Sequence, residues 1–151
     1  MSIRLKKTNS KNTDFIRLVK LLDSDLAVRN GEEQSFYAQY NKIALIKNVI
    51  VVYENDVPIG CGAFKEYETG IAEVKRMYTL PDQRGKGIAT TILSGLENWA
   101  SELGYSKCIL ETGKKQSEAI ALYKKNGYAN TSNYGQYVNI ENSVCFEKTL
   151  K

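Results

Sequence analysis

Four consecutive residues, Arg84-Gly85-Lys86-Gly87, stand just before a stretch with helical spacing, and their types suit the binding of an anion. Glycines let the backbone turn tightly and approach a ligand closely. The N–H groups in the first turn of a helix have no partner within the helix, and together with the helix dipole they favour a negative charge. Arg84 and Lys86 add charged hydrogen-bond donors. The segment therefore predicts a binding site for phosphate.

Two common phosphate-binding motifs agree less well with this segment. A P-loop of the form G-x-x-x-x-G-K-[ST] would need glycine at position 80 and Ser or Thr at position 87, where the chain has Leu80 and Gly87. A dinucleotide fingerprint agrees better, because Gly85-x-Gly87-x-x-Thr90 resembles G-x-G-x-x-G and Glu111 follows where an acidic residue could bind a ribose. However, Thr90 replaces the third glycine, and a three-strand meander precedes the loop. We keep this motif only as a minor alternative.

The composition limits which other kinds of site are available. The 151 residues suit a single domain, 1–151, and the net charge of +4 comes from basic residues interleaved with acidic ones, which does not suggest a nucleic-acid surface. The chain has no histidine, which excludes Ser-His and Cys-His nucleophiles and histidine-based metal sites, and we predict no metal. Its three cysteines lie in apolar runs, which is typical of small buried residues. No apolar run has the length of a signal-peptide core or a membrane span, so we expect a cytoplasmic protein without membrane contact.

Hydrophobic periodicity places the loop within a mixed α/β arrangement. Residues with the helical period predict helices at 13–26 and 88–103, a shorter one at 117–126, and a short helix within 27–46. Alternating or β-branched runs predict strands at 3–8, 48–54, 59–68, 71–80, 107–112, 128–138 and 143–150. The order β-α-α-β-β-β-α-β-α-β-β indicates a mixed sheet with helices on its faces.

The loop and its surroundings resemble one known family. Arg84-Gly85-Lys86-Gly87-Ile88-Ala89 matches the R/Q-x-x-G-x-G/A signature of the GCN5-related N-acetyltransferases, the GNAT family. The segment AEVKRMYTLPDQRGKGIATTIL (72–93) is similar to the family's fourth strand, loop and third helix, and SEAIALYKKNGY (117–128) is similar to its A-x-x-L-Y-x-x-x-G-F/Y segment. The three matches occur in the family's order and together span residues 71–128.

The resemblance implies the acyl-CoA N-acyltransferase fold, with a central, mostly antiparallel sheet that splays between its fourth and fifth strands and helices on both faces. It also implies acetyl-CoA as cofactor, with the pyrophosphate on the N–H groups of residues 84–89. The implied cofactor-binding residues are Met77, Tyr78 and Thr79 through their main chain, the loop residues Arg84, Gly85, Lys86, Gly87, Ile88 and Ala89, and Gln116 and Tyr123. Gln116 stands where the family often has Asn.

Acetyl transfer to an amine needs an acid for the leaving sulfur and a base for the amine. Tyr123 matches the family tyrosine that can protonate the departing sulfur, and the alternative is that it only packs beside Leu122. Glu73 begins the strand of the cofactor contacts, and strand alternation places it on one face with Lys75 and Met77. We predict Glu73 as the base acting through water, with an exposed ion pair to Lys75 as the alternative. Glu111 on the next strand is the other candidate.

Two tyrosine-rich stretches lie where the family forms its acceptor site. Tyr37, Tyr40, Tyr134 and Tyr137 are predicted to line a small polar pocket with Glu111. We therefore expect an N-acetyltransferase for a small-molecule amine. Acetylation of protein lysines or N-termini and a CoA-binding module without turnover remain alternatives, and a homodimer is one option for the assembly.

Overall fold

A computed structural model describes residues 3–30 and 46–150, with side chains for residues 3–25 and 46–150. Within these residues the helices are α1 (Thr13–Asn30), α3 (Ile88–Glu102) and α4 (Ser117–Lys125). The strands are β1 (Ile3–Thr8), β2 (Asn48–Glu54), β3 (Val57–Glu68), β4 (Ile71–Thr79), β5 (Lys107–Gly113), β6 (Ala129–Thr131) and β7 (Ser143–Thr149). The short helix expected within 27–46 falls largely on residues 31–45, outside the described part of the chain.

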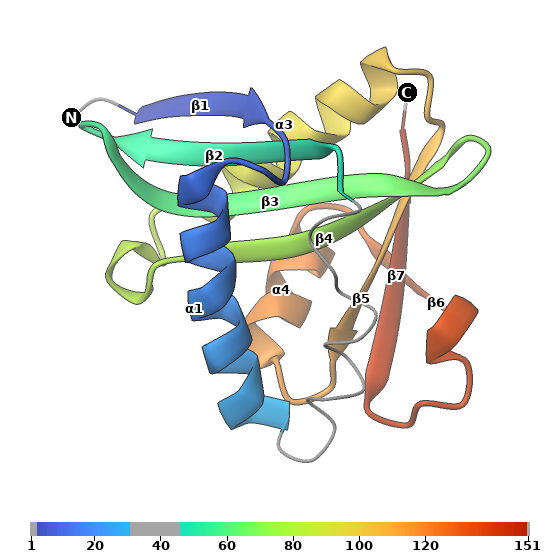
Figure 1. Ribbon diagram of the computed structural model, residues 1–151. Coiled ribbons are helices and arrows are strands. Elements are labelled where there is room, and N and C mark those ends of the chain that lie inside the picture. The colour runs from blue at the N-terminus through green and yellow to red at the C-terminus, as the bar shows by residue number, and fades with distance from the viewer. Residues whose placement is uncertain (1–2, 31–45, 151) are drawn as a thin grey trace.

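The described strands form one mixed sheet in the order β1-β2-β3-β4-β5-β7-β6. Neighbouring strands are antiparallel except β4 and β5, which are parallel. This parallel pairing covers only Ile71–Glu73 against Lys107–Ile109, and beyond it the two strands separate (Figure 1). The mostly antiparallel sheet with a splay at this pair, expected from the sequence, is confirmed.

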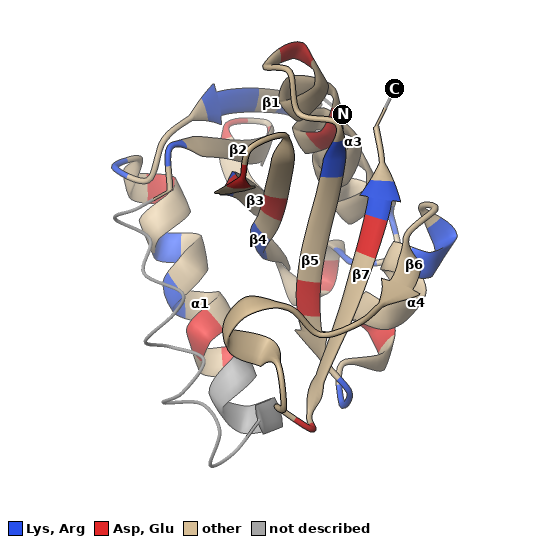
Figure 2. Ribbon diagram, turned by 90° about the vertical axis from the view of Figure 1, so that its right-hand side faces the viewer, with Lys and Arg blue, Asp and Glu red and all other residues tan. Residues whose placement is uncertain are grey.

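Helices cover both faces of the sheet, with α1 on one face and α3 and α4 on the other (Figure 1). Four residues that follow the helical period in α1, namely Phe15, Leu18, Val19 and Leu22, are at most 8% exposed. The helix begins where the sequence predicts, because the Asn12 side chain accepts a hydrogen bond from the Phe15 N–H at 2.9 Å. Figure 2 shows basic and acidic positions interspersed over the sheet and helices rather than gathered by sign.

Both α3 and α4 end in a glycine with a left-handed backbone. Gly104 (φ 96°) and Gly127 (φ 91°) each follow the C-cap, and the next N–H closes the turn onto the Ala100 and Tyr123 carbonyls. This turn exposes Leu103, which the sequence places on the buried stripe of the helix. Leu103 is 55% exposed because the helix ends at Glu102.

The strand predicted at 128–138 is wrong in its extent. Only Ala129–Thr131 pairs with β7, and the chain then leaves the sheet and forms a 3₁₀ helix at Gly135–Tyr137. The Asn133 side chain donates hydrogen bonds to the carbonyls of Tyr137, Ile140 and Ser143, each at 3.2 Å. These bonds replace a strand ladder with a closed loop, which brings the tyrosines of this segment toward β4.

Candidate active site

A bulge in β4 determines which side chains face the splay. Cys61 pairs with Tyr78 but Ala63 pairs with Lys75, so two residues of β4, Arg76 and Met77, oppose one residue of β3. Arg76 has a left-handed backbone (φ 60°), which is uncommon for a residue other than glycine. The expected common face for Glu73, Lys75 and Met77 is therefore wrong. Met77 packs against the core on the α3 face instead.

The bulge gathers three charged residues of β4 on the α1 face. Glu73 and Lys75 form an ion pair of 3.7 Å, and the Arg76 guanidinium contacts Asp23 of α1 at 2.8 Å. Without the extra residue, alternation would direct Arg76 to the α3 face. The bulge thus creates a charged region where β4 and β5 separate.

Two cavities open at this point, and they share part of their walls. The larger, about 320 Å³, lies along the end of β4, the loop 84–87 and the first turn of α3; we call it the loop cavity. The smaller, about 110 Å³, lies between β4 and β5 and is lined by residues that include Glu73, Glu111 and Tyr137; we call it the splay cavity. Met77, Gln116 and Tyr123 border both cavities, so the two cavities adjoin at these residues.

Every residue predicted to bind the cofactor lines the loop cavity except Lys86. The Lys86 Nζ instead contacts the Gln83 side chain at 3.3 Å on the surface. Arg84 donates from Nε to the Thr79 carbonyl at 2.9 Å, which ties the loop to the end of β4. Gln116 precedes the first residue of α4 and borders both cavities.

The loop has the features of an anion site. Gly85 and Gly87 have left-handed backbones (φ 78° and 83°), and a Cβ built on either of them meets no heavy atom within 4 Å. The backbone there faces open space that a ligand can approach closely. Gly87 is the N-cap of α3 and offers no side-chain cap, so the first-turn N–H groups remain available for an anion.

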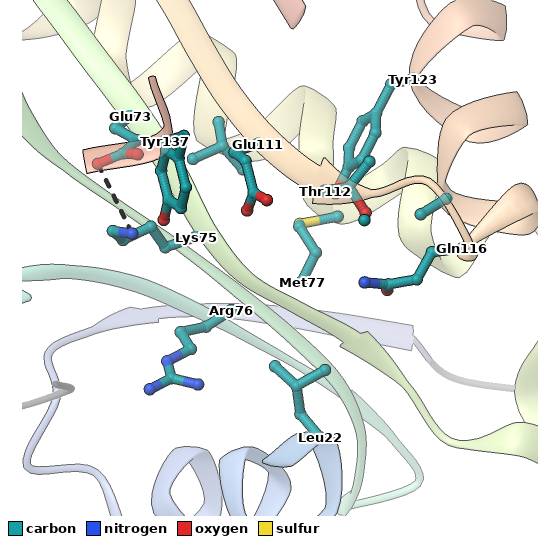
Figure 3. A pocket seen from close by; sticks show the side chains of 13 residues that line it. Leu22, Glu73, Lys75, Arg76, Met77, Glu111, Thr112, Gln116, Tyr123 and Tyr137 are labelled. Carbon is teal, nitrogen blue, oxygen red and sulfur yellow. Dashed lines mark ion pairs between the residues drawn. The ribbon is translucent and has the colours of Figure 1, made fainter. Parts of the chain in front are cut away.

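Tyr123 lies at the junction of the two cavities (Figure 3). Tyr123 is only 6% exposed, and its ring packs edge-on against the ring of Tyr128 with centroids 5.8 Å apart. Burial raises the pKa of Tyr123 above the usual value for tyrosine, and the negative charge of Glu111 raises this pKa further. The hydroxyl therefore holds its proton at neutral pH.

Glu73 is buried rather than exposed, which contradicts the alternative of a surface ion pair. It is 2% exposed and accepts a hydrogen bond of 2.7 Å from the Tyr134 hydroxyl, besides its contact with Lys75. Lys75 is 8% exposed, and burial lowers its pKa although the charge of Glu73 acts in the opposite direction. The pair thus lies inside the splay cavity (Figure 3).

The predicted acceptor tyrosines divide into two groups. Tyr37 and Tyr40 lie outside the described residues. Tyr137 lines the splay cavity, and Tyr134 packs edge-on against it with ring centroids 5.7 Å apart. Glu111 lines the same cavity and accepts a hydrogen bond of 2.7 Å from the Ser143 hydroxyl. Figure 3 shows Glu111 between the Glu73 end and the Tyr123 end of the cavity.

Sequence reasoning missed Arg76 as a residue of this site. Its side chain is 5% exposed and lines the splay cavity, whereas the period of a regular strand directs it elsewhere. The signal that could have found it lies on β3, where Gly60 and Gly62 are unusual inside an apolar strand. A Cβ at Gly62 would meet Met77 Sδ at 2.5 Å, so this glycine makes room for the side chain that the bulge displaces.

The chain matches the family model described as "Acetyltransferase (GNAT) family" over residues 16–128. This match covers the loop, the splayed strands and the tyrosine helix, which supply most of the residues that line both cavities. The chain belongs to the GNAT family. The GNAT resemblance inferred from the sequence is therefore confirmed, and the chain is an N-acetyltransferase with acetyl-CoA as its acetyl donor.

Named relatives of this GNAT chain agree with that assignment. It is 38% identical over 102 residues to an IAA acetyltransferase of Azospirillum brasilense, an alignment that covers 67% of each chain. It is 35% identical to the N-acetyltransferase YsnE of Bacillus subtilis over 65% of this chain and 66% of the relative. The chain thus spans about two thirds of the length of these relatives.

Solved structures show the same fold over nearly the whole chain. An acyl-CoA N-acyltransferase described from Klebsiella pneumoniae superposes with a TM-score of 0.83 at 27% identity, covering 99% of this chain and 98% of that one. The PaiA N-acetyltransferase of Thermoplasma acidophilum, in complex with coenzyme A, gives a TM-score of 0.74 at 21% identity and 99% coverage of both chains. The GNAT fold expected from the sequence is confirmed.

The loop cavity suits coenzyme A on the observations of this structure alone. It offers the open backbone at Gly85 and Gly87, the uncapped start of α3, and the cations Arg84 and Lys125 on its wall. These groups match the pyrophosphate of a nucleotide-bearing thiol. Within the described residues no helix is long and apolar enough to cross a membrane.

Proposed function

We propose that this enzyme transfers the acetyl group of acetyl-CoA to the amine of a small molecule by direct attack on the thioester. The observation that carries the proposal is the junction of the two cavities at Met77, Gln116 and Tyr123. The splay cavity, at about 110 Å³, is small. A water takes roughly 10–15 Å³ by this measure, so the cavity holds a ligand of about ten non-hydrogen atoms. A single domain supplies both sites.

The loop residues 84–89 would hold the pyrophosphate, and the main chain of Met77–Thr79 would lie beside the pantetheine arm. Acetyl-CoA supplies the thioester whose acetyl group is transferred. Tyr123 would donate the proton of its hydroxyl to the sulfur as the carbon–sulfur bond breaks. Its position at the junction supports this role, and burial keeps the phenol in the neutral form that can donate.

Two carboxylates are available to the acceptor amine, and we propose different roles for them. Glu73 would remove a proton from the attacking amine, directly or through water. Lys75 and Tyr134 fix its carboxylate in the cavity wall. Glu111 lies nearer to Tyr123, since its charge raises the pKa of that tyrosine, and would bind the amine while Ser143 holds it.

Glu73→Gln should lower kcat/KM for the amine by about 10-fold, which is less than the 10²–10⁴ that a general base typically supplies, because Glu111 remains in the cavity. Gln keeps an acceptor for the Tyr134 hydroxyl but removes the charge that pairs with Lys75, so the stability of the variant is measured alongside its kinetics. Steady-state kinetics at several pH values measure the effect. Glu147→Gln is the control, because Glu147 also pairs with a strand lysine, Lys107 at 3.1 Å, but lines neither cavity. An unchanged kcat/KM in Glu73→Gln would exclude the base role.

Two alternatives are weaker on the described residues. Acetylation of protein lysines or N-termini would need a groove for a peptide on both sides of the amine, and the small volume of the splay cavity, about 110 Å³, favours a small acceptor instead. A CoA-binding module without turnover would not need a buried tyrosine at the junction. We also infer that the enzyme acts in the cytoplasm, which is supported by its three free cysteines, Cys61, Cys108 and Cys145.

Release of free thiol from acetyl-CoA tests the proposal directly. The panel should contain small amines, lysine-containing peptides and peptides with free N-termini, each at equal concentration, with mass spectrometry of the products. We expect thiol release that depends on a small amine and an acetylated product of that amine. Turnover with peptides alone, or tight acetyl-CoA binding without turnover of any amine, would contradict the proposal.

A further inference from the structure

The Arg76 side chain is buried but only partly paired. Its side chain is 5% exposed and contacts Asp23 through Nη1 at 2.8 Å, whereas the Asp23 side chain is 44% exposed. The Arg76 Nε is buried and has no hydrogen-bond partner among the described residues. A buried donor without an acceptor is rare in folded proteins, and it indicates a group that is paired when the site is filled.

The left-handed backbone of Arg76 points to the same conclusion. A non-glycine residue with φ 60° in the middle of a strand is strained, and such strain is concentrated at ligand sites. The bulge directs the side chain to the face that lines the splay cavity, on the side of α1 (Figure 3).

The chemistry of the guanidinium indicates which ligand group would pair with Arg76. The Nε–H and a neighbouring Nη–H form a planar fork that matches the two oxygens of a carboxylate. Of the other charged groups on β4 in this cavity, Glu73 and Lys75 pair with each other. Arg76 belongs to the β4 wall of the cavity, on the side of α1, and Glu111 belongs to the β5 wall.

We propose that the acceptor carries a carboxylate as well as its amine, so that Arg76 binds the carboxylate while Glu111 binds the amine near the cofactor. The substrate class is an amino acid or a similar amino-carboxylic acid of about ten non-hydrogen atoms, as the cavity volume of about 110 Å³ allows. This inference rests on the proposed function. It also disfavours di- and polyamines, whose second cation would face Arg76 and Lys75.

The test compares each amino acid with its carboxamide, which keeps the size and the amine but removes the negative charge. Amidation lowers the pKa of the amine and makes it more available as the neutral nucleophile, so a poorer carboxamide cannot be explained by the amine. We expect kcat/KM for the active amino acid to exceed that of its carboxamide by at least about 10-fold, mostly through KM.

The variant Arg76→Asn then tests whether Arg76 binds the carboxylate of the acceptor. Asn adopts left-handed backbones more readily than most residues, so the bulge should be retained. We expect an increase of about 10-fold in KM for the amino acid and no change for the carboxamide. Arg17→Gln is the matched control, an exposed arginine on the α1 helix, and acetyl-CoA titration by calorimetry shows that each variant is folded.

Three results would overturn the inference while the proposed function stands. They are equal kcat/KM for amino acid and carboxamide, an equal loss for both in Arg76→Asn, and a preference for diamines. The comparison of the two acceptors on the unmodified enzyme decides the matter even if Arg76→Asn does not fold. Absence of thiol release with every small amine would instead contradict the proposed function, and this inference with it.

Discussion

Tyr123→Phe should lower kcat by about 10–10³-fold and leave the affinity for acetyl-CoA almost unchanged. In the role proposed for it, the hydroxyl acts only as the carbon–sulfur bond breaks, so its removal would affect the transition state and not the bound ground state. Phe keeps the edge-on contact with Tyr128 and the packing against Phe146. Because this packing is retained, the free energy of unfolding should change little.

Tyr128→Phe is the matched control for this experiment. Tyr128 is also a buried tyrosine, 3% exposed, and stands next to Tyr123, but it lines neither cavity. Its hydroxyl donates to Glu97 at 2.9 Å, so the control variant should lose stability and retain kcat. Wild-type kcat in Tyr123→Phe, under conditions where chemistry is rate-limiting, would leave Tyr123 as a packing residue.

The pH dependence of kcat in wild type and in Tyr123→Phe gives a second test of Tyr123 as the acid. Burial raises the pKa of Tyr123, so its proton is lost only above the usual tyrosine value of about 10. The neutral form is therefore kept throughout the range below pH 10, and any loss of stability from ionisation of this phenol occurs above it. A decline of kcat below pH 10 should appear equally in wild type and Tyr123→Phe, because it must come from another group.

Gly87→Val should weaken acetyl-CoA binding by at least about 30-fold, as measured by isothermal calorimetry. This corresponds to roughly 2 kcal/mol, the loss of about one charge-assisted hydrogen bond between the loop backbone and the pyrophosphate. Two effects combine. The φ of 83° is strained for valine, and the new side chain fills the open space that the backbone offers to the ligand.

Gly104→Val separates these two effects. Gly104 also has a left-handed backbone (φ 96°), and a Cβ built there meets no heavy atom within 4 Å, but it lies at the opposite end of α3 and lines neither cavity. Both variants should lose about 1–2 kcal/mol of stability through backbone strain. Only Gly87→Val should lose affinity. Equal acetyl-CoA affinity in both variants would remove the loop from the cofactor site.

The sequence predicts the loop and the tyrosine helix because their signals are local. Glycine adopts the left-handed backbone that Gly85 and Gly87 have without steric cost, and the helix ends at Gly104 and Gly127 follow from the same rule. The order of helices and strands along the chain then leaves only a few possible arrangements of the strands in the sheet. These features are set by residues a few positions apart, so one sequence suffices to find them.

The charged side of the splay could not be predicted in this way. The bulge at Arg76 depends on the pairing of β4 with β3, and alternation applied to β4 alone assigns Met77 to the wrong face. The burial of Glu73 depends on Tyr134, 61 residues away in the chain, which reaches it because Asn133 closes a loop. Contacts between distant segments thus decide the acceptor site, while local rules decide the cofactor site.

The central claim is that acetyl donor and amine acceptor meet where the loop cavity and the splay cavity join. A bisubstrate compound, in which a two-carbon bridge links the sulfur of CoA to the nitrogen of the best acceptor, would occupy both cavities at once. Calorimetry should show that this compound binds at least about 10-fold more tightly than CoA, because the linked acceptor occupies its site at a high effective concentration. An affinity no higher than that of CoA would contradict the claim that the two cavities form one active site.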